Sequence, residues 1–331
     1  MKPAWLTWAG AVAALGALAL AAISPAAAAR GWRIGFVACA TAVLGCVLLT
    51  LIGDLTGGRW AERTRPIAGA APGLLPIALP LGLGLGSIYT WTAGGGLPGH
   101  AGVYLDEGFF AARSLAALGL WGALGWLLAR RDLSRLMLGL GVLAHAILSI
   151  VVAFDWVLSL RPGWVSSDFP MNLIAQQIAV AAALTLLLGG QATERERRDL
   201  ATLMVAGVLG VAYLAFMDYL IVWYGNLPDR VGWYLGRAPT AWLAALALVV
   251  GSLAAPLVLV APRLTLRFKT GVAAALALAG LLAFQLYLFT PLLSWASLAG
   301  AVLSAVAQAA VLSAVARRWP ATLASRRAVH G

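Results

Sequence analysis

The feature that most constrains this chain is a series of apolar runs, each about 20 residues long, repeated along the sequence. A helix of that length spans the roughly 30 Å hydrocarbon core of a bilayer. Within lipid every backbone polar group must be paired inside the segment, so the runs are predicted to be helices. The composition, 62% hydrophobic and 11% charged, excludes an ordinary soluble domain. The sequence therefore predicts an all-α integral membrane protein, with one polytopic membrane domain over residues 1–331.

Ten membrane spans are predicted, and the charges of the loops between them indicate the orientation. The spans cover residues 4–24, 34–53, 73–92, 109–128, 136–158, 169–189, 200–223, 238–261, 270–290 and 296–316. Most of the 23 Lys and Arg residues fall on one side of this arrangement, at the two termini and in the loops that follow the even-numbered spans. Cytoplasmic loops carry the excess of Lys and Arg, so both termini are predicted to be cytoplasmic. The net charge of +11 is accordingly interpreted as a signal of membrane orientation and not as a sign of nucleic-acid binding.

The first predicted span has two interpretations. A basic residue, an apolar run and the small-residue run 24–29 resemble a secretory signal with its cleavage site. The apolar run is long for such a signal, and Trp5 and Trp8 are typical of interfacial anchors, so we expect the span to be retained. Cleavage would leave nine spans and an outer N-terminus. In both cases Arg30 and Arg33 are predicted to lie in an outer loop.

The third predicted span contains three glycines, Gly82, Gly84 and Gly86. No strand precedes them, so this is not a nucleotide-binding loop. Glycines at such spacing let membrane helices approach closely, and we expect that role for these three.

Motifs for metals and redox cofactors are missing from the sequence. Of the three histidines, His100, His145 and His330, only His145 lies inside a predicted span, and there is no C-x-x-C-H motif or cysteine set for an iron–sulfur cluster. Cys39 and Cys46 are interpreted as buried apolar residues, because a disulfide between them within one helix is geometrically excluded. We therefore expect no metal site and no bound cofactor in this chain.

Four ionisable residues fall within the predicted spans: Arg113, His145, Asp155 and Asp218. A charge at mid-bilayer costs about 2.5–3.5 kcal/mol, so each is a candidate functional residue. The two acids have two interpretations that the sequence leaves open. They belong to a proton path or to the polar end of a quinone pocket, or one of them forms an ion pair with Arg113 that ties helices together. For His145 we expect a packed, hydrogen-bonded side chain.

Two predicted outer loops carry further candidate residues. The end of the fifth span and the loop after it contain Trp156, Ser159, Trp164 and Ser166. The end of the seventh span and the loop after it contain Trp223, Tyr224, Asn226, Pro228, Asp229, Trp233, Tyr234 and Arg237. Aromatic residues gather where membrane helices meet water, so an aromatic belt is sufficient to explain most of the Trp and Tyr residues.

Three segments of this chain resemble ActF, the NrfD-related membrane subunit of bacterial alternative complex III, a quinol-oxidising electron-transfer complex. The most specific is Trp223-Tyr224-Gly225-Asn226-Leu227-Pro228-Asp229, followed by Trp233-Tyr234-Leu235 and Arg237. The other two are Phe154-Asp155-Trp156-Val157-Leu158-Ser159-Leu160 with Trp164, Ser166 and Ser167, and Tyr104-Leu105 with Phe109-Phe110 and Arg113. The resemblance runs from about residue 60 to 260, and departs from the family at Asp218, where the family usually has Gln.

The resemblance implies a fold and a set of partners. The fold is NrfD-like, with ten helices arranged as two four-helix bundles flanked by the terminal helices. The partners are a quinol-binding NrfD-like sister subunit, an iron–sulfur subunit and cytochrome c subunits in the bacterial inner membrane, and these would carry all haem and iron–sulfur groups. Asp155, Asp218 and His145 are then proton-path candidates with Arg113 as counter-charge. A quinone or quinol contact with this chain is left open.

Two other classes of function remain as alternatives. One is a stand-alone transporter of protons or small solutes, which inverted repeats with broken helices would favour. The other is a purely structural anchor for a membrane complex.

Overall fold

A computed structural model describes residues 4–93, 99–130, 132–160, 166–188, 192–235, 246–247, 254–255, 257–260 and 265–317. Over these ranges the chain is helical and contains no strand. Eight of the described helices are long and apolar enough to cross a membrane. They are α1 (Ala4–Ile23), α2 (Pro25–Thr56), α7 (Glu107–Arg130), α8 (Arg135–Trp156), α9 (Phe169–Leu188), α10 (Glu194–Tyr224), α13 (Leu266–Leu288) and α14 (Trp295–Arg317). The protein is therefore an all-α multi-pass membrane protein.

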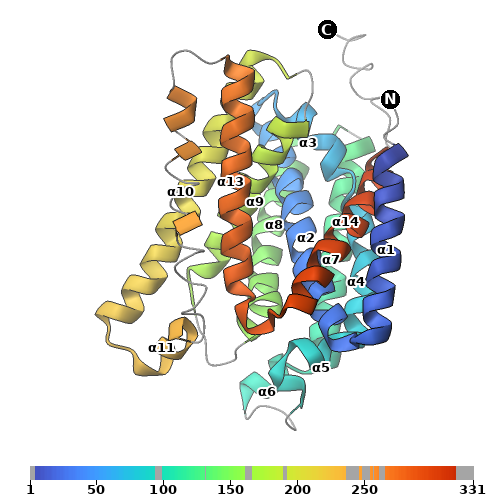
Figure 1. Ribbon diagram of the computed structural model, residues 1–331. Coiled ribbons are helices and arrows are strands. Elements are labelled where there is room, and N and C mark those ends of the chain that lie inside the picture. The colour runs from blue at the N-terminus through green and yellow to red at the C-terminus, as the bar shows by residue number, and fades with distance from the viewer. Residues whose placement is uncertain are drawn as a thin grey trace.

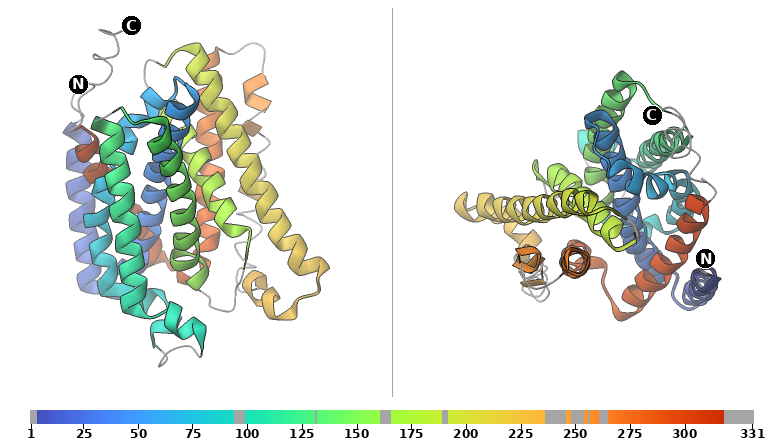
Figure 2. Two further views of the ribbon diagram at one scale, coloured as in Figure 1. Left: turned by 180° about the vertical axis from the view of Figure 1, so that it is seen from behind. Right: turned by 90° about the horizontal axis from the view of Figure 1, so that it is seen from above.

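The long helices stand side by side, and α1 and α2, α7 and α8, α9 and α10, and α13 and α14 each form an antiparallel pair (Figure 1). Helix α1 begins and α14 ends at the same end, which we call the terminal end; the opposite end is the far end (Figures 1 and 2). The short helix α3 (Ala61–Ala68) lies at the terminal end, whereas α6 (His100–Tyr104) and α11 (Pro228–Leu235) lie at the far end (Figure 1).

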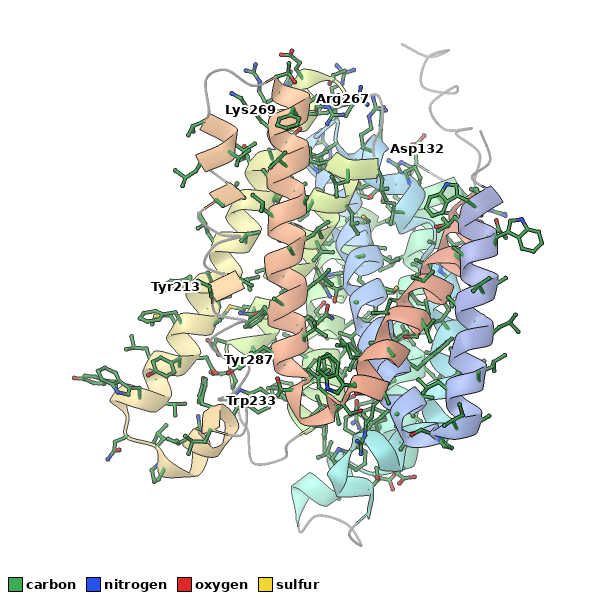
Figure 3. All side chains as sticks on the ribbon, viewed as in Figure 1. Asp132, Tyr213, Trp233, Arg267, Lys269 and Tyr287 are labelled. Carbon is green, nitrogen blue, oxygen red and sulfur yellow. The ribbon has the colours of Figure 1, made fainter. Side chains whose placement is uncertain are left out.

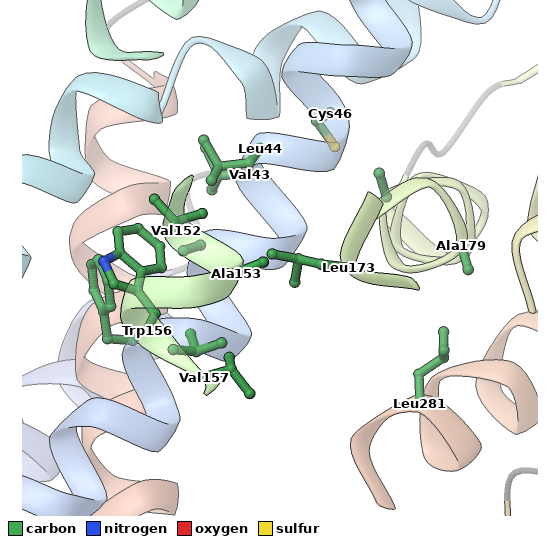
Figure 4. Close-up of a cluster of buried hydrophobic side chains, with 14 of the residues drawn as sticks. Val43, Leu44, Cys46, Val152, Ala153, Trp156, Val157, Leu173, Ala179 and Leu281 are labelled. Carbon is green, nitrogen blue, oxygen red and sulfur yellow. The ribbon is translucent and has the colours of Figure 1, made fainter. Parts of the chain in front are cut away.

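The core of the bundle is built around α2, which packs against α14, α9, α3 and α8. Figure 4 shows part of this core, to which α2 contributes Leu44, α8 contributes Val152 and α9 contributes Leu173. Both cysteines carry free thiols; Cys46 is buried in this core, as the sequence predicts. The helices without such all-round contact, α1 above all, keep most of their apolar surface exposed, as expected for surface that faces lipid.

The prediction of an outer loop between the first two spans is wrong. Helix α2 begins at Pro25, directly after Ser24, so Arg30 and Arg33 lie in the helix. Proline is favoured in the first turn of a helix, and the alanines that follow have the highest helix propensity. The short break at Ser24 therefore lets the chain reverse and continue as helix at once.

The third predicted span, 73–92, is not one helix. It consists of η1 (Ala71–Gly73), α4 (Leu74–Ala78), η2 (Leu79–Gly84), α5 (Leu85–Ile88) and η3 (Thr90–Ala93). Proline removes a backbone donor and glycine lowers helix propensity, so Pro76, Pro80 and the glycines interrupt the α-helical pattern. Of the three glycines only Gly84 makes the expected close approach, since a Cβ there would lie 2.4 Å from the Cβ of Ala29.

The other predicted spans agree with long helices, with two qualifications. Helix α10 begins six residues before the predicted span 200–223, because Thr193 and Glu196 form a capping box: the Glu196 amide donates to Thr193 Oγ1 (3.3 Å) and the Thr193 amide to Glu196 Oε2 (2.7 Å). The predicted span 238–261 lies mostly outside the described residues.

Charged side chains gather at the terminal end. Arg65 pairs with Asp54 (2.6 Å) and Arg63 with the buried Glu196 (3.1 Å). Figure 3 shows Asp132, Arg267 and Lys269 at this same end. This is the end that the positive-inside pattern assigns to the cytoplasm.

One prediction tests the closest helix contact in the core. A Cβ at Gly45 of α2 would lie 1.9 Å from the backbone oxygen of Gln177 in α9, whereas a Cβ at Gly139 meets nothing within 4 Å. Gly45→Ala must push the two helices apart, and we expect it to cost about 1–3 kcal/mol of folding free energy. Gly139→Ala is the matched control and should leave the melting temperature in detergent unchanged or raised. Equal melting temperatures for both variants would contradict this packing.

Candidate functional site

The predicted Arg113–Asp155 ion pair is present at the far end of the bundle. Arg113 of α7 donates from Nε to Asp155 Oδ2 and from Nη2 to Asp155 Oδ1 of α8, both at 2.9 Å. The guanidinium also covers the rings of Tyr104 (3.9 Å to the centroid) and Phe109 (4.3 Å). Asp155 is fully buried. Of the two pairings that the sequence leaves open for Arg113, the structure therefore selects Asp155 and not Asp218.

A second buried arginine, Arg33, lies beside this pair, and sequence reasoning missed it. Its exposed fraction is 2%, and its Nη2 donates to the hydroxyl of the buried Tyr89. The guanidinium carbon lies 5.3 Å from the ring centroid of Tyr89 and 5.7 Å from that of Trp156. Two arginines thus share the electrostatic field of one carboxylate, Asp155. Cation–π contacts provide part of the compensation for burying the second positive charge.

Asp218 belongs to a second polar cluster at the far end. The hydroxyl of Tyr234 in α11 donates to Asp218 Oδ2 of α10 at 2.6 Å. Burial raises the pKa of that hydroxyl well above its usual range, and the hydrogen bond to Asp218 adds to the shift, so Tyr234 stays a donor. Ser166 and Asp168, just before α9, also interact with the Asp218 side chain.

Asp168 and Asp218 form a carboxyl pair. Asp168 accepts a hydrogen bond from Ser166 at Oδ1, whereas its buried Oδ2 has no donor among the described residues. The two carboxyl groups interact electrostatically, and ionising both at once is costly because like charges repel. Asp168 was not a candidate from the sequence. Its position before Phe169-Pro170 suggests only a helix start, and nothing local indicates that Asp218 would face it.

His145 occupies the middle of α8 in a fixed neutral form. The indole Nε1 of Trp121 donates to His145 Nδ1 (3.1 Å), so the ring proton is on Nε2, which donates to Gln177 Oε1 (2.8 Å). The imidazole has no exposed surface. Both ring nitrogens are engaged, and the structure thus supports the packed, hydrogen-bonded interpretation of this histidine.

We expect His145→Leu to lower the folding stability of the chain and to have no direct effect on proton transfer. Leucine fills a similar volume but leaves the buried donor of Trp121 unpaired and the amide oxygen of Gln177 with only its 3.5 Å hydrogen bond from Ser149 Oγ, at a cost of about 1–3 kcal/mol. His145→Gln restores a donor and an acceptor and should lose less. Melting temperatures of the purified variants measure this. A His145→Leu variant as stable as wild type would show that the two hydrogen bonds contribute nothing.

The aromatic residues of the two loops divide into exposed and buried sets. Trp223 and Tyr224 are exposed at the end of α10, as an aromatic belt requires. The belt interpretation is wrong for Trp156 and Trp233, which are 4% and 3% exposed. Trp156 donates from Nε1 to Ser114 Oγ (3.1 Å) and thereby links α8 to α7.

The remaining predicted residues of these loops hold the turns. Asn226 adopts the left-handed conformation (φ 47°), which asparagine tolerates better than most residues, and Pro228 then begins α11. Ser159 donates to the backbone oxygen of Asp155 (2.6 Å) and closes the end of α8. Trp164, Arg237 and the side chain of Asp229 lie outside the described residues.

The far end therefore carries two polar clusters, an arginine–carboxylate network around Asp155 and the Asp168–Asp218 carboxyl pair. Within the described ranges no three His, Cys, Asp or Glu side chains are grouped as metal ligands. A scan against models of known protein families and a search of the curated proteins found no match to this chain.

Proposed function

We propose that this chain is a membrane subunit of a bacterial quinol-oxidising respiratory complex of the alternative complex III type. It carries no redox metal in this proposal, and its partners are a quinol-binding sister subunit, an iron–sulfur subunit and cytochrome c subunits. Its ten spans, with both termini cytoplasmic, would form the two four-helix bundles of an NrfD-like fold in the inner membrane. The resemblance to ActF in three separate segments is the basis of the proposal.

The observation that carries the proposal is that residues from these three segments contact one another. Arg113, from the Tyr104–Arg113 segment, pairs with Asp155 of the Phe-Asp-Trp segment. Tyr234, from the Trp-Tyr-Leu segment, donates to Asp218, which also contacts Ser166 at the end of the Phe-Asp-Trp segment. The three segments that resemble ActF are far apart in the sequence, yet their polar residues meet at the far end of the bundle. This is expected if the resemblance reflects one functional site.

The roles within the proposal differ between the two acids. Asp155 is buried, doubly hydrogen-bonded and charge-paired, and it serves to tie α7 to α8. The Asp168–Asp218 pair is the proton-holding element, since a pair of carboxyl groups takes up and releases one proton readily. Released at the far end, such a proton would accompany quinol oxidation in the neighbouring subunit. A direct quinone contact with this chain is not required.

A transporter is the second candidate, and one observation favours it. The segment from α4 to α5 is a broken helix, and broken helices line the substrate sites of many transporters. A transporter built from inverted repeats would need a second broken helix in the corresponding place. Among the described long helices, α7, α8, α9, α10, α13 and α14 are each continuous.

The experiment that separates these functions is a purification of the tagged chain in mild detergent. The complex should bring haem absorption bands and an iron–sulfur subunit with it, identified by spectroscopy and by peptide sequencing. A colourless chain that purifies alone would refute the respiratory subunit and leave the transporter as the better proposal. A structural anchor would also co-purify with these subunits, and acid substitutions then distinguish it.

A further inference from the structure

A cavity of about 180 Å³ lies near the far end, between α2, α7 and the broken segment from α4 to α5. Its walls are almost entirely apolar and include Phe36, Phe110 and Leu118. Arg33, Ser114 and Trp156 supply the polar groups. A cavity of about 150 Å³ holds a benzene ring, so this one admits a small head group with a few carbon atoms.

The polar groups that this cavity offers are hydrogen-bond donors. The Nε–H of Arg33 is buried and has no acceptor among the described residues. The Ser114 oxygen accepts from the indole of Trp156, which leaves its own proton for another partner. Buried donors are normally paired, so both groups call for an oxygen acceptor.

The charge of the neighbourhood points to an anion. Arg33 and Arg113 face a single buried carboxylate, Asp155, which Arg113 holds through both oxygens. Within the part of the chain that the structure describes, no carboxylate lies within ion-pair distance of Arg33. One buried positive charge is therefore left without a counter-ion, and a buried charge is costly unless it is paired.

The mouth of the cavity opens on surface that faces lipid. Leu79 and Leu115 line it and are 62% and 46% exposed. Gly82 also lines the cavity and is itself exposed, and a Cβ there meets nothing within 4 Å. An acyl chain can thus leave the cavity between the α4–α5 segment and α7 and run along the outside of the bundle.

We propose that this cavity binds a single-chain lipid with an anionic oxygen head group, with the head against Arg33 and Ser114. The volume favours one acyl chain, as in a fatty acid. A phospholipid phosphate has the same head-group chemistry and is the other source of such a ligand. This site is separate from the Asp168–Asp218 pair and does not depend on the proposed function.

The test uses the full chain purified in detergent, with any partners that remain bound, and measures binding of oleate, phosphatidylglycerol and uncharged methyl oleate by native mass spectrometry. Gly82→Leu fills the mouth of the cavity, and Gly119→Leu is its matched control, since Gly119 of α7 is exposed, lies outside the cavity and has open space at its Cβ. Arg33→Gln removes the charge, and size-exclusion profiles report whether each variant is folded.

Oleate should bind to wild type and Gly119→Leu, and at least tenfold more weakly to Gly82→Leu and Arg33→Gln. Phosphatidylglycerol bound with that same pattern would keep the anionic head group but overturn the single-chain identity of the ligand, because this lipid has two acyl chains. Methyl oleate bound as well as oleate, or equal oleate binding by Gly82→Leu and Gly119→Leu, would overturn the proposal. If Arg33→Gln does not fold, the two glycine variants still decide the outcome.

Discussion

Asp155→Leu is expected to destabilise the protein by about 3–5 kcal/mol, the largest stability loss that we predict for a single substitution. The change leaves the guanidinium of Arg113 buried without its carboxylate, because both of its hydrogen bonds to Asp155 are lost. It also removes the acid that acts electrostatically on Arg33. A buried charge without a partner cannot recover its hydration, so the folded state bears most of this cost.

The double variant Arg113→Met/Asp155→Leu separates a structural from a functional role. Well-packed apolar residues often replace a buried ion pair at little cost, so the double variant should recover most of the melting temperature lost by Asp155→Leu. Recovery should be incomplete because Arg33 still lacks its electrostatic partner. Glu107→Leu is the control, since Glu107 is exposed at the start of α7 at the same end of the bundle.

The two measurements are the melting temperature of each variant and the rate of quinol oxidation by the proposed respiratory complex that contains it. If Asp155 serves only to tie α7 to α8, the double variant regains activity together with stability. A double variant that is stable but inactive would assign Asp155 to proton transfer and contradict its role as a helix tie. A loss no greater than that of Glu107→Leu would show that the ion pair contributes little to folding.

The sequence was sufficient for the class of fold because the hydrophobic pattern is strong over long segments. Most predicted spans coincide with helices, since a run of about 20 apolar residues in lipid has no other way to pair its backbone. The prediction failed where local chemistry overrode that pattern. Pro76 and Pro80 interrupt the third span, and the alanines after Pro25 continue as helix where a loop was expected.

The candidate site was predictable only in part. Arg113 and Asp155 were found because a charge inside an apolar run is conspicuous, and their pairing was one of two alternatives. Arg33 escaped because it was placed in a loop, where an arginine requires no explanation. Asp168 escaped because its importance lies in a contact with Asp218 on another helix, and one sequence contains no information on which helix faces meet. Burial of Trp156 and Trp233 was missed for the same reason.

In the proposed respiratory complex, Asp218→Asn is expected to lower the rate of quinol oxidation about 100-fold, while the stability of the chain stays the same or rises. Positioned proton transfer typically contributes a factor of about 10²–10⁴ to a rate, and the substitution removes one acid of the Asp168–Asp218 pair. Asparagine keeps an oxygen for the hydroxyl of Tyr234, which lies 2.6 Å from the Asp218 oxygen in the wild type, and its NH2 group can donate to the buried Oδ2 of Asp168.

The same logic applies to Asp168→Asn, because a single remaining carboxylate no longer shares a proton with a neighbour. Both variants should therefore be slow and stable, whereas Glu107→Gln, at an exposed acid of the same end, should match wild type in rate and melting temperature. Fast oxidation by a stable Asp218→Asn complex would remove the pair from the proton path. Loss of rate in step with loss of stability would instead make the pair a structural contact between α10 and the start of α9, and the chain an anchor. Asparagine is neutral and has the same shape as aspartate, so it tests the proton alone. If the chain has the respiratory role, the asparagine variants lose activity although they are folded. If the chain is a structural anchor, a folded asparagine variant keeps its activity.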